Sequence, residues 1–292
     1  MNASMNTVGM AGATVVTQEQ LLSCLSHLPS LPAVAAELLQ SLDGEAQDTD
    51  ALAQKMAKDP ALTADTLRLA NSSFYGLGRK VGNLHDAILV LGLRQLRALV
   101  VTAAVVRNLR SPGEWFNLKG FWRHSLGVAL CARELAPHAY AQPERAYLAG
   151  LLHDIGRLAL ATCFPDATRE VRAYRAHHDC STLEAERDIL GLDHTDAGRI
   201  LANQWHFPNV IQQAIACHHA PDAEESTSLA GLIHVADVMT HALDLGQDED
   251  DLVPQLSAVA WHRLDLDWSE FAMHLAQVEE AHRSLMPLLI PD

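Results

Sequence analysis

The sequence predicts an all-α protein made of two packed helical bundles. Apolar residues recur at helical spacing through most of the chain, and no stretch shows the alternating, β-branched-rich pattern of a strand. The breaks between these segments carry proline, aspartate, glycine and serine, which start helices or form turns. With 49% hydrophobic residues in 292, the chain can bury a substantial core.

The first half is predicted to form a bundle over residues 18–112, after a flexible tail at 1–17. The tail has no basic start and mostly small apolar residues, so it does not resemble a signal peptide. Pro32 and Pro60 each suit the first position of a helix, and Asp59 can cap the second of these helices. The expected helices cover residues 18–24, 32–42, 49–58, 60–70, 84–92 and 93–107.

The second half is predicted to form a separate helical subdomain over residues 113–292. Its boundary is the turn-forming run of Arg, Ser, Pro and Gly at 110–113. The acidic run at 246–251 is interpreted as a solvated loop. The expected helices cover residues 115–136, 144–163, 165–177, 182–190, 196–205, 208–218 and 228–245, followed by a C-terminal pair after Pro254.

Composition argues against a nucleic-acid partner, a membrane span and a disulfide-forming compartment. Lys and Arg number 21 against 36 for Asp and Glu, a net charge of −15, so a nucleic-acid partner has no electrostatic basis. No apolar run reaches the roughly 18 residues of a membrane span. The five cysteines are scattered and form no CxxC pair, which predicts reduced thiols in a cytoplasmic protein rather than disulfides or a zinc ribbon.

The segment 149–158 places His153 and Asp154 side by side inside an apolar run. Burying both polar groups costs free energy unless a partner compensates, and a divalent metal is the usual partner. Neighbours on a helix point about 100° apart, so the pair could bracket one ion at a helix surface. The alternative is an ion pair between Asp154 and Arg157, three residues later.

Two more polar residues lie on apolar helix faces. His124 shares a stripe with Val128 and Leu135 and should point inward, either as a metal ligand or as a hydrogen-bonded core histidine. Asp237 lies on an equally apolar face and needs a metal, an arginine or a histidine as partner. A simple pair with His234 or His241, about one turn away, would also satisfy it.

Three further histidines complete a candidate ligand set. His218 and His219 end the helix that begins near Pro208, where the helix dipole alone would favour them. His194 precedes a helix that Asp193 or Thr195 can cap, and it could be an ordinary loop residue. Together the candidates offer nitrogen and oxygen donors suited to one or two ions of Zn, Fe, Mn or Ni. They are His124, His153, Asp154, His194, His218, His219 and Asp237.

The order of these residues resembles the HD superfamily of metal-dependent phosphohydrolases, whose pattern is H…HD…D on a helical scaffold. His124, the pair His153-Asp154 and Asp237 match its four positions. The additional histidines resemble the second-metal ligands of HD-GYP cyclic-di-GMP phosphodiesterases. The resemblance implies an HD-like fold for the C-terminal subdomain.

The N-terminal half resembles the HDOD domain, a bacterial signalling module related to HD-GYP. The similarity runs from about residue 21 to residue 245. Its motifs are LPSLP at 28–32, DPAL at 59–62, LRLANS at 67–72 and AILVLG at 87–92.

The sequence departs from the active HD-GYP pattern in three places. No Gly-Tyr-Pro segment follows His219, the lysine expected after the His-Asp motif is Arg157, and Gly120 stands where a carboxylate would precede the first histidine. HDOD domains commonly lose the metal ligands, whereas this chain keeps them.

The resemblance implies a cytoplasmic bacterial signalling or interaction module with a retained metal site and without strong turnover. Its partners would be signalling proteins or a nucleotide second messenger, and the exposed side of either bundle could form a homodimer. The alternative is a metal-dependent phosphodiesterase or phosphohydrolase acting on a cyclic nucleotide or dinucleotide. In that case Asp154 and Arg157 would be catalytic, and Arg123 and Arg157 would contact phosphate. A third possibility is a buried polar network that only holds the helices in register.

Overall fold

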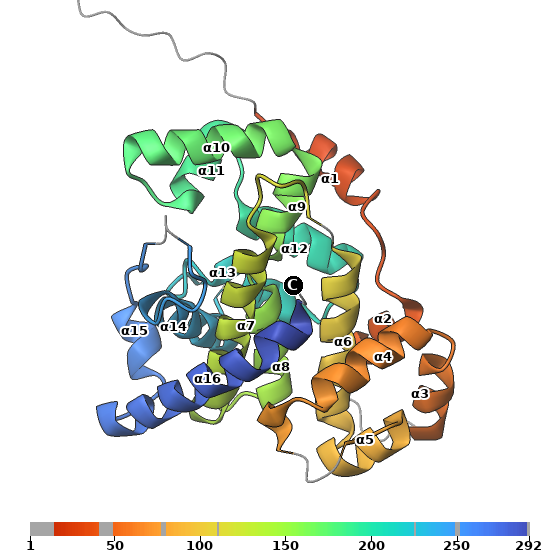
Figure 1. The fold of residues 1–292 in the computed structure, drawn as a ribbon. Helices are drawn as coiled ribbons and strands as arrows, with labels where there is room; N and C mark the ends of the chain where they lie inside the picture. The colour runs from red at the N-terminus through yellow and green to blue at the C-terminus, as the bar shows by residue number, and fades with distance from the viewer. Residues whose placement is uncertain are drawn as a thin grey trace, which may run out of the picture.

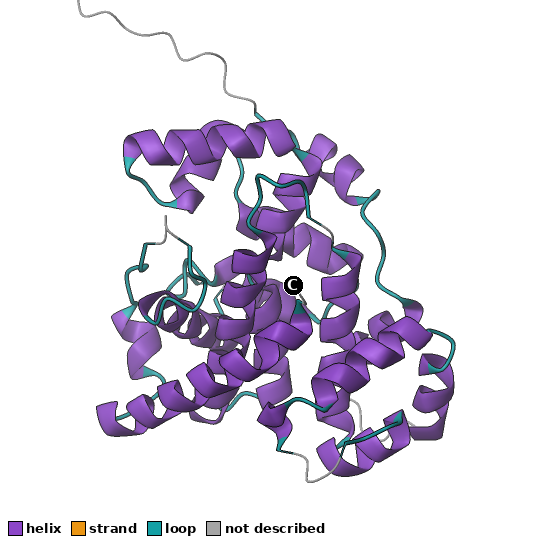
Figure 2. Cartoon of the chain, viewed as in Figure 1, coloured by secondary structure: helices purple, strands orange, loops and turns teal. Residues whose placement is uncertain are grey.

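Every regular element in the described part of the chain is a helix, which confirms the all-α prediction (Figures 1 and 2). The structure is a computed structural model and describes residues 15–40, 49–76, 80–109, 111–224, 226–248 and 252–290. None of the helices in these ranges combines the length and apolarity needed to cross a membrane. The predicted flexible tail lies outside the described residues up to position 14, and Val16 is buried, with its amide donating to the Leu190 carbonyl.

The first half forms the expected helices around a central one, α6. Helices α2, α4 and α5 pack against α6, whose middle is buried throughout. The end of the helix expected at 32–42 lies outside the described residues after position 40. The observed bounds are α1 (Gln18–Leu25), α2 (Ala33–Gln40), α3 (Thr49–Met56), α4 (Pro60–Ala70), the short 3-10 helix η1 (Ser73–Tyr75), α5 (Leu84–Leu91) and α6 (Leu93–Asn108).

The second half is organised around α7, which packs against α8, α14 and α16. Helix α12 packs against α9 and α13. The observed bounds are α7 (Leu118–Leu135), η2 (Ala136–Ala139), α8 (Pro143–Leu152), α9 (Ile155–Cys163), α10 (Pro165–His178), α11 (Thr182–Leu190), α12 (His194–Gln204), α13 (Asn209–Cys217), α14 (Ser228–Ala242), α15 (Ala258–His262) and α16 (Trp268–Leu289).

One predicted helix is wrong: the expected helix at 144–163 is two helices, α8 and α9, broken at His153 and Asp154. Two glycines explain the break. A Cβ at Gly150 would lie 2.8 Å from the Ala129 backbone on α7, and a Cβ at Gly156 would lie 1.8 Å from the His194 carbonyl oxygen on α12. Helices α8 and α9 each press against a different neighbour, so the chain turns between them.

The two halves are joined by more than the segment between α6 and α7. Helix α1 packs against α9 and α12, and α16 reaches back to α4 and η1 (Figure 1). The Arg68 guanidinium on α4 donates to the Leu288 carbonyl on α16 over 3.1 Å. The buried apolar residues accordingly form one continuous cluster across both halves.

A disulfide joins Cys24 on α1 to Cys163 at the end of α9, with the two Cα atoms 5.8 Å apart. The expectation of reduced thiols is therefore wrong for this pair, while Cys131, Cys180 and Cys217 form no disulfide. The two cysteines are 139 positions apart in the sequence. No local spacing could reveal the pair, because it depends on α1 packing against the second half.

We expect Cys24→Ala to lower the thermal midpoint by about 5–10 °C under oxidising conditions, because the closed loop removes conformational entropy from the unfolded chain. Differential scanning calorimetry with and without reductant measures the effect. In the matched control Cys180→Ala, a free half-buried thiol is lost, and the midpoint should keep its dependence on reductant. A wild-type midpoint that ignores reductant would contradict the disulfide.

Asp59 caps α4 and also pairs with Arg107 on α6. Its Oδ1 accepts from the Leu62 amide at 3.0 Å and from the Arg107 guanidinium at 3.0 Å. The Arg107 hydrogen bond is the main cause that lowers the pKa of Asp59 to about 2. Because the folded pKa is depressed, the stabilisation is present above the unfolded pKa near 3.8 and disappears as the pH falls through 2.

We expect Asp59→Asn to destabilise the fold by about 1–2 kcal/mol at pH 7, a value discounted for the partial exposure of the pair. Asparagine can still cap the helix, so the loss of stability measures the contribution of the Asp59 charge. Urea unfolding from pH 7 to pH 2 should show the two proteins converging at acidic pH. Asp166→Asn, which alters an exposed pair with Arg169, should show little effect at either pH.

Candidate metal centre

All seven candidate ligands of the sequence analysis meet at one place inside the second half. His124 comes from the middle of α7, His153 and Asp154 from the turn between α8 and α9, and Asp237 from α14. The remaining histidines are the first residue of α12 and the two residues that follow α13. Within the described residues they form two groups with metal-ligand spacing: His124, His153 and Asp237, and Asp154, His194, His218 and His219.

The first cluster, His124, His153 and Asp237, is fully buried. The Nε2 atoms of His124 and His153 lie 3.0 and 3.6 Å from the Asp237 Oδ1 atom. The two Nε2 atoms are 3.3 Å apart. Three donor atoms of one carboxylate and two imidazoles therefore point at a common position.

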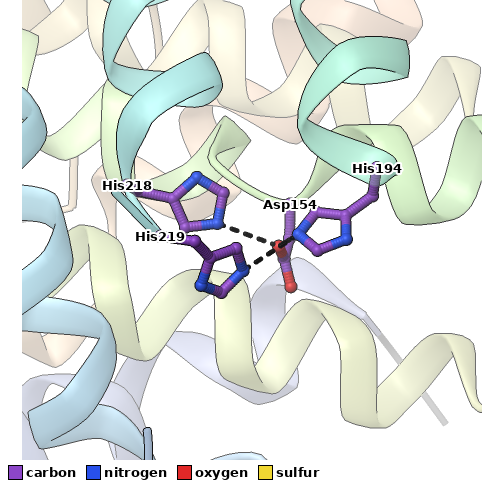
Figure 3. Close-up of side chains that lie close together, drawn as sticks. All are labelled: Asp154, His194, His218 and His219. Carbon is purple, nitrogen blue, oxygen red and sulfur yellow. Dashed lines mark hydrogen bonds and ion pairs between the residues drawn. The ribbon is translucent and has the colours of Figure 1, made fainter. Parts of the chain in front are cut away.

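The second cluster, Asp154, His194, His218 and His219, is arranged around a carboxylate in the same way (Figure 3). The Nε2 atoms of His194 and His218 lie 3.3 and 3.5 Å from the Asp154 Oδ1 atom. The Nε2 atoms of His194 and His219 are 3.0 Å apart. His219 is the only one of the four that is half-exposed.

His153 connects the two clusters. Its Nε2 atom faces Asp237 in the first cluster and lies 3.7 Å from the Asp154 Oδ1 atom in the second. Its ring centroid is 5.0 Å from that of His218. The turn between α8 and α9 therefore places His153 and Asp154 at the join between two adjacent groups of donors, which a straight helix would not do.

The second nitrogen of three histidines is held from outside the clusters. The Nδ1 atoms of His153 and His218 each lie 2.8 Å from a backbone carbonyl oxygen, of Gly150 and Ile215. A carbonyl can only accept, so both rings carry the proton on Nδ1 and turn the lone pair of Nε2 inward. His194 Nδ1 lies 2.6 Å from the Glu186 carboxylate. Such outer partners orient histidines toward a metal.

The buried polar atoms of the site fit a divalent cation. Asp154 Oδ1, Asp237 Oδ1 and His218 Nε2 are buried and have no hydrogen-bond partner of acceptable geometry. Leaving such atoms unsatisfied costs about 1–3 kcal/mol each, and more for charged groups. A cation in the second cluster would satisfy Asp154 Oδ1 and His218 Nε2, and one in the first cluster would satisfy Asp237 Oδ1. The oxygen and nitrogen donors suit Zn, Fe, Mn or Ni.

The electrostatics of the site keep the carboxylates ionised and several imidazoles neutral. Burial opposes ionisation, but His153 and Arg157 hold the pKa of Asp154 well below its usual range. The neighbouring imidazoles of His124, His153 and His241 do the same for Asp237. Burial lowers the pKa of His124 and His218. Neutral imidazoles and charged carboxylates are the protonation states that metal ligation requires.

His194 behaves differently. Burial lowers its pKa, but the carboxylates of Glu186 and Asp154 outweigh burial and raise the pKa to about 9. The Glu186 carboxylate also accepts from the His194 backbone amide at 2.8 Å. Sequence reasoning missed Glu186, because nothing in its position on α11 distinguishes it from an exposed helix carboxylate. Asp193 caps α12 as predicted, accepting from the Thr195 amide at 2.8 Å.

The two candidate phosphate contacts lie in different surroundings. The Arg157 guanidinium donates to Asp154 Oδ2 over 2.9 Å, as the ion-pair alternative predicted, and its side chain is still 31% exposed. Arg123 on α7 donates to the Leu245 carbonyl over 3.2 Å.

Of the two histidines considered as simple partners of Asp237, only His241 faces its carboxylate. His234 instead contacts the His218 carbonyl and the Ser257 amide.

Gly156 is the residue that allows α9 to approach α12. A Cβ at this position would lie 1.8 Å from the His194 carbonyl oxygen and 2.6 Å from the Gly198 amide nitrogen. Both atoms belong to backbone and cannot rotate away. The separation of Asp154 from His194, and so the second cluster, depends on this contact.

We expect Gly156→Ala to destabilise the protein by about 3 kcal/mol or more, since backbone has to move to accept the methyl group. The matched control is Gly231→Ala on α14, where a Cβ would meet its nearest atom at an ordinary 3.7 Å. That change should be neutral or stabilising by up to about 1 kcal/mol. Chemical denaturation of the two variants provides the comparison, and equal stability of the two would contradict the contact.

The fold and the site together define an HD-type helical protein with a His/Asp cluster suited to divalent metal. The HDOD domain family model matches residues 28–221. The chain belongs to the HDOD domain family, as the sequence motifs predicted. The match ends before α14, so Asp237 lies beyond it.

Comparison with solved structures and curated proteins finds similar chains from Shewanella, Geobacter and Treponema. A Shewanella amazonensis SB2B protein, described as a candidate phosphohydrolase, is 30% identical with a TM-score of 0.76, covering 93% of this chain and 98% of that one. A Geobacter sulfurreducens HDOD domain protein of unknown function shares the fold, at 24% identity and a TM-score of 0.77, covering 94% of this chain and 100% of that one.

An uncharacterized Treponema pallidum (strain Nichols) protein is 24% identical over 235 residues, which is 79% of this chain. The chain spans about half the length of this curated relative, since the match covers 45% of it.

Proposed function

We propose that this protein is a signalling or interaction module of the HDOD type that holds one or two divalent transition-metal ions. The observation that carries the proposal is the pair of buried carboxylate oxygens, Asp154 Oδ1 and Asp237 Oδ1, which lack hydrogen bonds and face imidazole nitrogens. Buried charges of this kind persist where a cation or a full set of donors compensates them.

Bound metal would cross-link helices that are distant in sequence. The donors come from α7, the turn between α8 and α9, α12, the end of α13 and α14. An ion shared by these elements would stabilise the folded state relative to the unfolded chain by its binding free energy. The ion would therefore couple the metal content of the cell to the surfaces that the module presents to a signalling protein, a nucleotide second messenger or a second copy of the chain.

Burial favours signalling over turnover. The donor side chains of the first cluster and of Asp154, His194 and His218 are at most 8% exposed. The segment after His219, where active relatives would carry Gly-Tyr-Pro, is held by Asp222, whose two carboxylate oxygens share the single donor of the Ser257 hydroxyl, each at 2.9 Å. Among the donors His219 is half-exposed, and the neighbouring Arg157 side chain is 31% exposed, so little of the site is open to a phosphodiester substrate.

The second candidate function is a metal-dependent phosphodiesterase or phosphohydrolase acting on a cyclic nucleotide or dinucleotide. Its support is the complete donor set and the similarity to the Shewanella protein described as a candidate phosphohydrolase. A bound ion would polarise a phosphate oxygen and lower the pKa of a coordinated water. Arg157, held by Asp154 and partly exposed, could offer its remaining N–H groups to a phosphate, and Arg123 is a further candidate contact.

Metal removal tests the proposal. We expect protein purified anaerobically to contain up to two equivalents of transition metal by elemental analysis, and chelation to lower its thermal midpoint by at least about 5 °C. Asp154→Asn should lose the metal of the second cluster and respond less to chelator. Asp166→Asn, a change of an exposed carboxylate, should keep both. Wild-type protein without metal after supplementation would contradict the proposal.

Two further measurements separate the alternatives. Cyclic di-GMP and bis(p-nitrophenyl) phosphate should not be hydrolysed above background by metal-loaded protein. Turnover that disappears in Asp154→Ala would replace the signalling proposal with the phosphodiesterase. For the buried-network possibility, His153→Ala would lower stability without changing metal content.

A further inference from the structure

The Cys24–Cys163 disulfide fastens α1 to the part of the second half that holds the second cluster. Cys24 lies near the end of α1, and Cys163 is the last residue of α9. Helix α1 packs mainly against α9 and α12 (Figure 1). The Val16 amide, just before α1, donates to the Leu190 carbonyl at the end of α11 over 2.8 Å. Helix α1 and the residue leading into it therefore contact α9, α11 and α12.

Each of these three helices supports part of the second cluster. Asp154 immediately precedes α9, and His194 is the first residue of α12. Glu186 on α11 accepts from the His194 backbone amide at 2.8 Å and lies 2.6 Å from its Nδ1 atom. Because His194 Nε2 lies 3.3 Å from Asp154 Oδ1, a shift of α9 relative to α12 changes the spacing of these donors. The packing of α1 against both helices opposes such a shift.

The disulfide supplies a large share of what keeps α1 in place. The helix has eight residues, and isolated helices shorter than about 12 residues are marginal in water. Its buried side chains are those of Leu21 and Leu25. The connection to α2, residues 26–32, contains no helix. Once the covalent link is broken, α1 depends on these few contacts to stay docked.

Both cysteines of the pair are open to thiol–disulfide exchange. They are half-buried, in contrast to Cys131, which is fully buried and whose thiol pKa burial raises to about 12. A thiolate can attack a disulfide only where it has access to a sulfur atom. A dithiol reductant would donate two electrons and two protons, converting the S–S bond to two thiols while the dithiol closes to its own disulfide. Exchange of this kind is how redox-sensing disulfides operate.

We propose that the Cys24–Cys163 disulfide is a redox switch for the second cluster. In the oxidised protein α1 is fastened onto α9 and α12, and Asp154 and His194 keep their spacing. Reduction by a dithiol releases α1, and the second cluster then holds its ion less tightly. The inference rests on the proposed function, because it requires that this cluster binds metal. It makes the thiol–disulfide balance of the surroundings an input to the module.

Thiol counting and hydrogen exchange test the release of α1. The chain has five cysteines, of which three form no disulfide, so the oxidised protein should show three thiols after denaturation and the reduced protein five. After reduction with dithiothreitol and anaerobic desalting, we expect the amides of α1 to exchange at least about tenfold faster, while those of the central helix α6 keep their rates. The double variant Cys24→Ser/Cys163→Ser should show the fast exchange without reductant.

Co²⁺ titration of the full-length protein in the absence of reductant tests the effect on the cluster. We expect Cys24→Ser/Cys163→Ser to bind one of two Co²⁺ ions at least about fivefold more weakly than the oxidised wild type, while the other ion binds unchanged. The matched control is Cys180→Ser, which removes a half-buried thiol that forms no disulfide. This control should bind both ions as the wild type does.

The outcomes separate the switch from the function on which it rests. Wild-type affinity for both ions in the folded double variant would overturn the switch and leave the metal centre standing. Five thiols in the oxidised protein, or exchange of α1 that ignores reduction, would do the same. Absence of Co²⁺ binding in the wild type would overturn the proposed function and the switch together. Should the double variant fail to fold by circular dichroism, the wild type reduced and desalted anaerobically replaces it, with the same loss of affinity expected.

Discussion

The burial of two ionised carboxylates, Asp154 and Asp237, is the constraint on which the second half of this protein depends. A buried carboxylate is tolerated only where opposite charge or donors surround it. Five helices converge to bring imidazole nitrogens to these two oxygens, and an outer layer of carbonyls and Glu186 fixes the rings. The same helix packing that forms the core therefore also places the imidazoles that compensate the two buried carboxylates.

Close backbone contacts at two glycines allow the helices to approach closely enough to bring the donors together. Gly150 lets α8 lie against α7, and Gly156 lets α9 lie against α12. Because these two contacts face different neighbours, the chain must turn at His153 and Asp154, and the turn directs the two side chains into adjacent clusters. In a continuous helix the two side chains would point about 100° apart around its axis, whereas the turn gives each of them its own cluster.

Much of this arrangement could be predicted from sequence, and the failures have physical causes. Helix positions followed from apolar periodicity and from capping residues such as Asp59 and Asp193. The break inside 144–163 was missed because the apolar run continues through it and the cause lies in contacts with distant helices. Glu186 and the Cys24–Cys163 disulfide were missed for the same reason: each depends on which helices become neighbours, and that information is not local. The ordered histidines and aspartates were found because their residue types are costly in apolar surroundings.

The two clusters differ in how much of each lies within the segment that the family model matches, because α14 lies beyond the end of that segment. Every donor of the second cluster falls within the segment that defines the family, whereas Asp237 of the first cluster comes from a helix beyond its end. The first cluster is thus assembled at the seam between a shared module and the C-terminal helices that follow it. The family segment alone carries six of the seven donors and lacks Asp237, so changes in the C-terminal region can alter the first cluster while the second persists.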